Sequence, residues 1–109
     1  MVKYAMCIDG DMNQLIGWNQ DADCYSAVWI YNISEDKDGN FIVYADTLIE
    51  PEDEDDEDGW EDEIWIYVED TIENIQYEID FAQREFDDPI NIVELKSEGN
   101  TWYPVRIVA

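Results

Sequence analysis

Residues 70–86 read DTIENIQYEIDFAQREF and contain the clearest helical pattern in the chain. Asp70 is a suitable N-cap, and Glu73, three residues later, can complete a capping box. Pro89 ends the pattern, because the residue before a proline avoids the helical region. The apolar residues recur at intervals of three and four and therefore fall on one face of a helix: Ile72, Ile75, Ile79, Ala82 and Phe86.

Strand patterns precede this helix. Residues 2–8 alternate in character before an Asp-Gly turn signal, which predicts a strand. Residues 25–33 and 41–47 are rich in β-branched and aromatic side chains, as strands are. The turn-forming residues at 34–40 predict that these two strands form an antiparallel hairpin. Residues 12–18 fit either a short strand or one helical turn.

Strand patterns also follow the acidic middle of the chain. Residues 64–68 predict a strand, and residues 90–95 and 101–108 predict a closing hairpin. Pro104 lacks a backbone N–H, which favours a sheet edge for the last strand. Together these patterns predict an α+β fold: an antiparallel sheet of about five or six strands with one main helix packed on one face.

The charge of the chain is extreme. Its 109 residues hold 29 Asp and Glu against five Lys and Arg, for a net charge of −24. Such an excess usually favours disorder, but a hydrophobic fraction of 46% with five Trp, seven Tyr and three Phe can supply a core. We therefore expect a single folded domain over residues 1–109. The acids are densest in an acidic loop at 50–63, where eleven of fourteen residues are Asp or Glu.

This composition argues against several classes of function. The chain has no His, which is the commonest general base and a common zinc ligand. A body with a net charge of −24 is repelled by nucleic acids and by anionic membranes. Solvated acidic runs supply many equivalent ionised groups, whereas acid–base catalysis needs two carboxyls with opposed pKa values. We expect no enzymatic activity, no catalytic residues and no cofactor.

Calcium binding is also disfavoured. An EF-hand loop places Gly at its sixth position and a bidentate Glu at its twelfth. With Gly59 at the sixth position the twelfth is Trp65, and with Gly39 it is Ala45. Neither frame supplies the final ligand, so we expect no dedicated metal site. Residues 1–9 lack the pattern of a signal peptide and no apolar run has the length of a membrane helix, which predicts a cytoplasmic protein.

The acidic residues themselves are the candidate binding groups. Duplex DNA carries one negative charge per ~1.7 Å of its axis, and same-face neighbours on a strand are ~6–7 Å apart. The spacing on a strand approximates that between successive phosphates of one DNA strand. Ordered rows of carboxylates on a folded domain can therefore imitate a phosphate backbone. On the helix, the spacing of seven residues predicts one such row, formed by Glu73, Asp80 and Asp87.

Aromatic residues near the acids are a second candidate group. Trp60 stands in the acidic run and is either an anchor for the loop or a hot spot for a partner. We expect Trp29 and Trp65 to pack in the core. The predicted partner-binding residues are Asp53, Glu54, Asp55, Asp56, Glu57, Asp58, Trp60, Glu61, Asp62, Glu63, Glu73, Asp80 and Asp87.

The small size, the pI near 4.1, the α+β pattern, the many aromatics and the lack of catalytic residues resemble the DNA-mimic inhibitor proteins of phages and mobile elements. That group includes anti-restriction proteins, anti-CRISPR proteins and uracil-DNA glycosylase inhibitors. The resemblance implies a stoichiometric inhibitor that fills the DNA-binding site of a host nuclease or a similar enzyme. It would act in the bacterial host cytoplasm as a monomer or homodimer, without binding nucleic acid or membrane.

Two other classes share this physical character. An immunity protein that neutralises a basic nuclease toxin would also be small, acidic and α+β. An acidic chaperone of a basic protein would bind many basic proteins with similar, weak affinity. High charge that serves solubility alone is a further alternative. It fits less well, because self-repulsion destabilises a small fold that does not use the charge.

Overall fold

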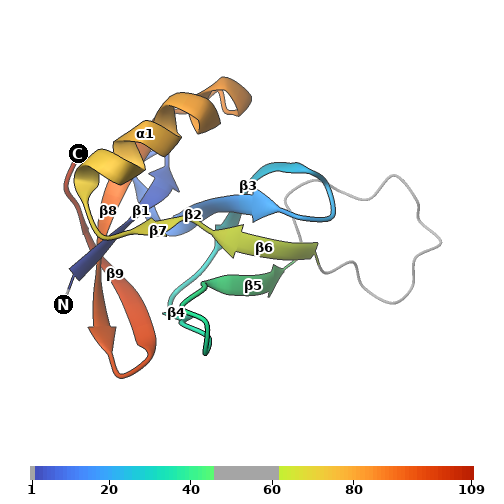
Figure 1. The fold of residues 1–109 in the computed structure, drawn as a ribbon. Coiled ribbons are helices and arrows are strands. Elements are labelled where there is room, and N and C mark those ends of the chain that lie inside the picture. The colour runs from blue at the N-terminus through green and yellow to red at the C-terminus, as the bar shows by residue number, and fades with distance from the viewer. Residues whose placement is uncertain (1, 46–61) are drawn as a thin grey trace.

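The computed structural model describes residues 2–45 and 62–109, in which a nine-stranded antiparallel sheet is covered on one side by a single helix (Figure 1). The helix α1 spans Ile72–Ala82 and continues into a 3-10 turn at Gln83–Glu85. The α+β class is confirmed, whereas the predicted number of five or six strands is too low. The strands are β1 (Val2–Ile8), β2 (Asp11–Asn19), β3 (Cys24–Trp29), β4 (Ile33–Ser34), β5 (Ile42–Ala45), β6 (Asp62–Ile66), β7 (Val68–Glu69), β8 (Ile90–Glu98) and β9 (Thr101–Ile107).

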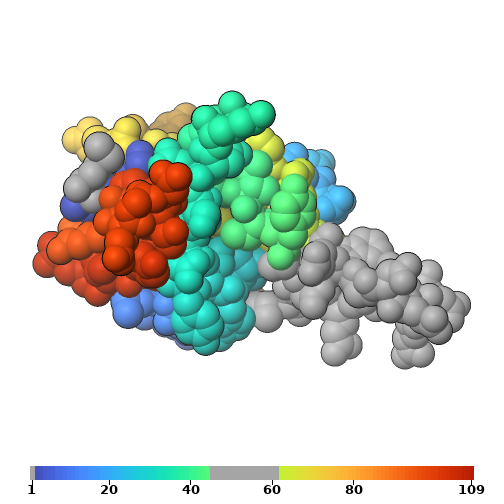
Figure 2. Space-filling model, turned by 90° about the horizontal axis from the view of Figure 1, so that it is seen from below, coloured from blue at the N-terminus to red at the C-terminus, as the bar shows by residue number. Residues whose placement is uncertain are grey.

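The strand order explains why the sheet bends. Its main path is β4-β9-β8-β1-β2-β6-β5, with β3 added to β2 and β7 added to β1. The chain of β6 and β7 is interrupted at Tyr67, and it pairs first with β2 and then with β1. Figure 2, seen from below, shows β9, the segment that contains β4, and β5 gathered on one face of the molecule. The sheet therefore curls toward itself on the side away from α1.

The central strands are buried on both faces. In β1, Ala5 and Cys7 belong to a core inside the curled sheet, while Met6 and Ile8 belong to a second core under α1. Neighbouring β2 residues divide in the same way: Leu15 lies in the first core and Ile16 in the second. A strand buried on both sides reads as a continuous apolar run rather than as an alternation. The other members of the second core are Ala27, Ile75, Ile79, Ala82 and Ile92.

The helix begins one residue later than predicted. Thr71, not Asp70, is the N-cap: its backbone is extended and its hydroxyl accepts a hydrogen bond from the Asn74 N–H. The Asp70 carboxylate instead pairs with Lys3 of β1. At the first turn, Ile72 is 41% exposed, so the apolar face that contacts the sheet begins at Ile75.

The predicted hairpin between residues 25–33 and 41–47 is wrong. β3 pairs with β2, and β5 pairs with β6. A tight turn explains the first pairing, because the Asn19 side-chain oxygen accepts hydrogen bonds from the N–H groups of Asp21 and Ala22. The turn at 34–40 does form, closed by Asp36, but it joins two strands that have other partners.

The remaining strand predictions fare better. Residues 12–18 lie within strand β2, which is one of the two alternatives, and β8 and β9 form the predicted closing hairpin. On its other side, β9 pairs with β4 at Thr101 and Trp102. Pro104 pairs with Leu95 of β8 and lies beyond the short contact with β4. On the side away from β8, Pro104 therefore has no strand partner among the described residues.

Candidate protein-interaction surface

Acidic side chains lie in several turns and at the end of α1, and hydrogen bonds connect these segments to one another in pairs. The β1–β2 turn contacts the segment after the helix, since the Asp9 N–H donates to the Pro89 carbonyl over 2.8 Å. The start of β3 contacts α1 and its 3-10 turn through Tyr25. The β2–β3 turn contacts the start of β6. We use the name acidic surface for the acids that lie in or next to these connected segments: Asp9, Asp11, Asp21, Asp23, Glu63, Glu78, Glu85, Asp87 and Asp88.

The buried amide of Asn19 organises one side of this surface. Asn19 is fully buried, and its Nδ2 donates to Asp62 Oδ2 over 2.8 Å and to Ser26 Oγ over 3.4 Å. Its Oδ1 accepts from the N–H groups of Asp21 and Ala22, each over 3.0 Å. Asp62 is only 4% exposed, so it supports the turn from inside. This burial argues against its predicted role as a partner-binding residue.

The neighbouring acids are held by donors that carry no charge. Asp21 Oδ2 accepts from the Glu63 N–H over 2.7 Å, and the Glu63 carbonyl accepts from the Gln20 N–H over 2.9 Å. The Tyr44 hydroxyl donates to Glu63 Oε1 over 3.2 Å. This hydrogen bond is the main cause that raises the pKa of Tyr44. These contacts fix the carboxylates in position and leave their negative charge in place.

Tyr25 does the same for two acids of α1 and its 3-10 turn. Its hydroxyl donates to Glu78 Oε2 over 3.1 Å, and its backbone N–H donates to Glu85 Oε2 over 3.3 Å. Burial raises the pKa of Tyr25, and its hydrogen bond to Glu78 raises it further. Tyr25 is therefore neutral at physiological pH, and it orders the two side chains without adding a positive charge beside them.

Two of the cations of the chain form ion pairs with acids outside the acidic surface. Lys3 pairs with Asp70, and Arg106 Nε pairs with Glu94 Oε2 over 2.9 Å. All five Lys and Arg lie within the described residues, together with nineteen of the 29 acids. Arg84, near the end of α1, lies 5.8 Å from the centroid of the Phe81 ring. No ion pair joins any cation to the acidic surface among the described residues, so that surface is strongly negative.

The structure describes only some of the predicted binding residues. Asp53, Glu54, Asp55, Asp56, Glu57, Asp58, Trp60 and Glu61 lie outside the described residues. Glu73, Asp80 and Asp87 are all exposed, but they do not form the predicted row. The helix ends at Ala82, so Asp87 follows it and belongs to the acidic surface instead.

Several acids of this surface were missed because they lie in turns. Asp9, Asp21, Asp23 and Asp88 are separated in the sequence, and the strand pairing and loop contacts decide which segments their turns meet. The sequence did contain one signal for these acids: most of them stand close to the Gly and Asn residues that mark turns at the ends of strands. Such turns lie at the margins of a sheet.

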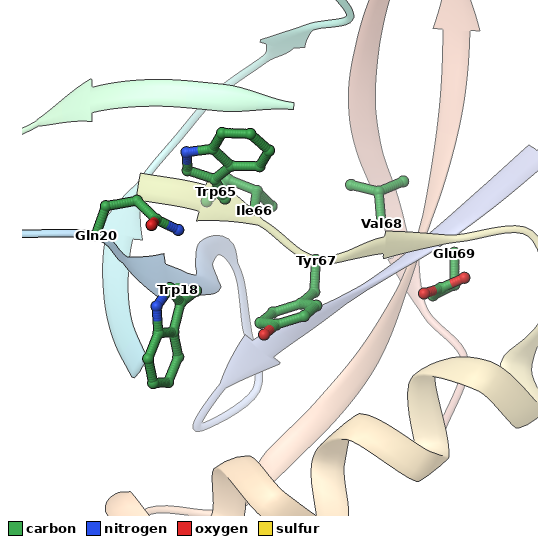
Figure 3. A pocket seen from close by; sticks show the side chains of 7 residues that line it. All are labelled: Trp18, Gln20, Trp65, Ile66, Tyr67, Val68 and Glu69. Carbon is green, nitrogen blue, oxygen red and sulfur yellow. The ribbon is translucent and has the colours of Figure 1, made fainter. Parts of the chain in front are cut away.

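An aromatic groove lies beside the acidic surface (Figure 3). Its volume is about 250 Å³, and β2 and the β6–β7 chain supply its walls. Trp18 and Trp65 are paired across β2 and β6. The prediction that Trp29 and Trp65 pack in the core is wrong, since they are 53% and 38% exposed, whereas Trp102 is buried. The groove is lined by Trp18, Gln20, Trp65, Ile66, Tyr67, Val68 and Glu69.

Comparison with known proteins identifies no relative. The chain matches no protein-family model, no curated protein and no solved structure. Within residues 2–45 and 62–109, no three His, Cys, Asp or Glu side chains are grouped so that they could hold a metal ion. In the same part of the chain, no helix is long and apolar enough to cross a membrane.

Proposed function

We propose that this protein is a stoichiometric inhibitor that mimics the charge of DNA. Its acidic surface would occupy the basic nucleic-acid-binding site of a host defence nuclease or another DNA-binding enzyme. The observation that carries this proposal is the bonding of the surface carboxylates to neutral donors, such as the Tyr25 hydroxyl and the Glu63 N–H. Such bonds order the acids without cancelling their charge.

The sign of the charge favours a protein partner with a basic surface. A negative domain and a basic site attract over long range, which raises the association rate and makes it fall with ionic strength. Individual exposed ion pairs contribute little, ~0.2–1 kcal/mol each, so many must act together. Carboxylates that are already fixed by hydrogen bonds lose less freedom on binding than mobile ones.

The proposed action needs no chemistry from this chain. Inhibition would follow from occupancy alone, one molecule for each site, in the cytoplasm of a bacterial host. The proposal is compatible with an anti-CRISPR or anti-restriction role, since both require a basic nucleic-acid-binding site to be blocked.

Competition with DNA is the test. The protein is immobilised, bacterial lysate is passed over it at low salt, and bound proteins are eluted with a salt gradient and identified. A captured DNA-binding protein is then mixed with a fluorescent duplex, and our protein is titrated into the preformed complex. The proposal predicts that the duplex is released at one equivalent, and that our protein alone does not shift the duplex in a gel.

The same titration separates the alternatives. A ternary complex in which the duplex stays bound would contradict mimicry and favour an inhibitor that acts away from the DNA site, as an immunity protein can. Weak capture of many unrelated basic proteins, with no duplex displaced at one equivalent, would contradict the proposal and favour an acidic chaperone.

A further inference from the structure

The aromatic groove has the composition of a site for a positively charged group. Two of its residues are tryptophans, which offer the strongest faces for cations. Glu69 adds a carboxylate at one end, as Figure 3 shows. Neither Lys nor Arg is among the described residues that line the groove. An anion would meet the wrong charge there, and a neutral apolar group would leave the carboxylate without a partner.

The rings on one side of the groove are held in place. Trp18 packs edge-on against Tyr25, with 5.1 Å between ring centroids, and Tyr25 packs against Tyr67 at 5.7 Å. Tyr25 is itself fixed by its hydrogen bond to Glu78. Figure 3 shows the side chains of Trp18 and Tyr67 extending to the same side of the β6–β7 chain. The groove therefore has a preformed aromatic wall.

The acids around this wall make it electronegative. The Glu69 carboxylate makes no hydrogen bond or ion pair in the part of the chain that the structure describes. Burial raises the pKa of Tyr67, and the negative charge of Glu78 raises it further, so the field of Glu78 extends to this ring. Trp65, 38% exposed, is open to an incoming group.

The geometry points to a cationic side chain, an arginine guanidinium of the partner protein, as the occupant of the aromatic groove. A guanidinium is planar and can stack on an aromatic ring, and it can donate two hydrogen bonds to a carboxylate, so it suits both kinds of group that line the groove. Lysine would satisfy the charge but not the stacking. The source of the arginine rests on the proposed function, whereas the preference of the groove for a guanidinium does not.

Small-molecule binding to the full chain tests that preference directly. N-acetyl-arginine methylamide and its neutral isostere N-acetyl-citrulline methylamide are titrated at constant ionic strength, and the indole N–H resonances are followed by NMR. We expect saturable shifts of Trp18 and Trp65 with the arginine compound, and binding at least about threefold weaker with the citrulline compound. Equal binding of the two compounds, or unsaturable shifts of the same size at the Trp29 indole outside the groove, would overturn the inference.

Matched variants locate the site. Glu69→Gln and Trp65→Leu should each weaken arginine binding by about threefold or more. Glu98→Gln and Trp29→Leu remove the same charge and the same ring away from the groove and should leave binding unchanged. Thermal melting verifies that each variant is folded, and Glu69→Gln alone suffices if Trp65→Leu is not. Equal weakening by Glu98→Gln would show that only net charge matters and would overturn the inference.

The two proposals can fail separately. If the duplex is displaced but the arginine compound does not bind, the inference is wrong and the DNA-mimic proposal stands. If the arginine compound binds in the groove but no DNA-binding protein loses its duplex, the groove remains a guanidinium site and the DNA-mimic proposal is wrong.

Discussion

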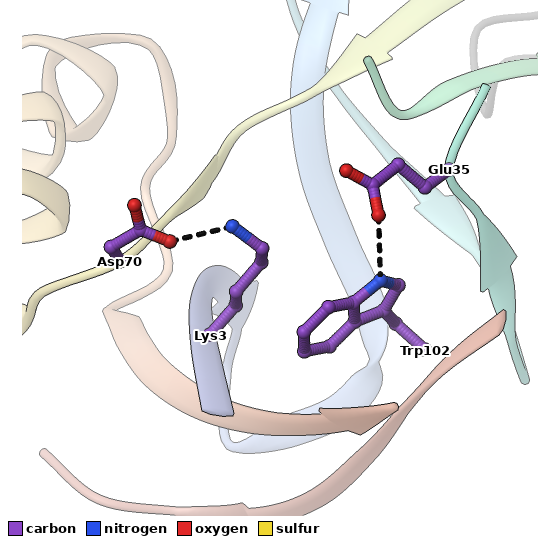
Figure 4. A network of polar contacts seen from close by, with 4 residues as sticks. All are labelled: Lys3, Glu35, Asp70 and Trp102. Carbon is purple, nitrogen blue, oxygen red and sulfur yellow. Dashed lines mark hydrogen bonds and ion pairs between the residues drawn. The ribbon is translucent and has the colours of Figure 1, made fainter. Parts of the chain in front are cut away.

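Two polar networks in this protein differ in the donor that binds a carboxylate, which is charged in one and neutral in the other. In the first, Lys3 Nζ pairs with Asp70 and lies 5.6 Å from the centroid of the Trp102 ring, whose Nε1 donates to Glu35 over 3.5 Å (Figure 4). In the second, the neutral amide of Asn19 donates to the buried Asp62. The Lys3 network cancels a negative charge, and the Asn19 network does not.

The difference teaches how a chain with five cations distributes its charge. Lys3, on β1, contacts Asp70 before α1 and Trp102 in β9, neither of which belongs to the acidic surface. At the acidic surface, amides, hydroxyls and backbone N–H groups take the structural role that cations have elsewhere. The surface keeps its charge because its donors are neutral, and this is the property that the proposed function requires.

The largest expected effect comes from Asn19→Asp, which breaks the Asn19 network while keeping the shape of the side chain. The substitution replaces the donor to Asp62 with a second buried carboxylate. We expect the free energy of unfolding to fall by ~3–5 kcal/mol at pH 7, measured by urea denaturation. The loss should shrink on mild acidification, because one of two adjacent carboxyls then takes up a proton.

The matched change in the Lys3 network is Asp70→Asn. Its partner Lys3 is 18% exposed and Asp70 is 77% exposed, so this ion pair is largely screened. We expect a loss of only ~0.2–1 kcal/mol. Equal losses for Asn19→Asp and Asp70→Asn would break the contrast between the two networks.

The next effect concerns the close approach of β2 and β6 at Gly17, two residues before Asn19. A Cβ atom on Gly17 would lie 2.6 Å from the Trp65 carbonyl oxygen and 2.9 Å from Ile66 Cα. Because both atoms belong to the backbone, β2 and β6 would have to separate. Gly17→Ala should therefore cost at least ~1–3 kcal/mol, measured by the same denaturation.

Gly10→Asn is the control for that substitution. A Cβ atom at Gly10 would meet no heavy atom within 4 Å, and Asn tolerates the positive φ of 71° found there. We expect a much smaller loss. A loss for Gly10→Asn as large as that for Gly17→Ala would show that the close approach of β2 and β6 is not the cause.

The sequence predicted the elements better than their pairing. The helix, the β8–β9 hairpin and most strands follow from periodicity and turn residues, because these signals are local. The partner of β3 does not, since β2 and β5 offer the same kinds of side chain, and the Asn19 turn decides between them only through side-chain hydrogen bonds.

The sequence predicted the acidic character of the candidate surface but not which acids form it. Net charge predicted a basic partner and an acidic surface, yet Asp62 is buried and Asp87 lies beyond the end of the helix. Strands buried on both faces also hid the curl of the sheet. That curl leaves room for Trp102 inside the sheet while Trp29 and Trp65 remain exposed.

A smaller effect sharpens the role of neutral donors at the acidic surface. Tyr25→Phe removes the hydroxyl that donates to Glu78 and should cost ~1 kcal/mol at pH 7. The pKa of Tyr25 is raised above its ordinary value of 10.0, chiefly by burial. Above pH 10 the unfolded chain therefore loses this proton first, and the folded protein loses the stability that Tyr25 contributes.

The difference in stability between wild type and Tyr25→Phe should therefore shrink as the pH rises above 10, measured by denaturation over a pH series. Tyr77→Phe is the control, because it removes a hydroxyl from a side chain that is 66% exposed. A constant difference for Tyr25→Phe would contradict the role assigned to its hydroxyl.

The smallest expected effect is that of salt. Exposed charges are screened within about 10 Å at 0.1 M salt, so added NaCl should relieve repulsion at the acidic surface and raise the melting temperature. The rise should be smaller in Asp87→Asn/Asp88→Asn than in wild type. A melting temperature that does not change between low and moderate salt would show that repulsion among these acids does not limit stability.

The most direct test of the central claim is the association rate with a captured DNA-binding partner. Asp23→Asn/Asp88→Asn removes two charges from the acidic surface, and Asp38→Asn/Glu98→Gln removes two exposed charges elsewhere. Because a fixed, uncancelled field steers the encounter, we expect the first pair to slow association by about threefold or more and the second to change it little. Equal slowing by both pairs would show that net charge alone acts, and would contradict a binding role for the acidic surface.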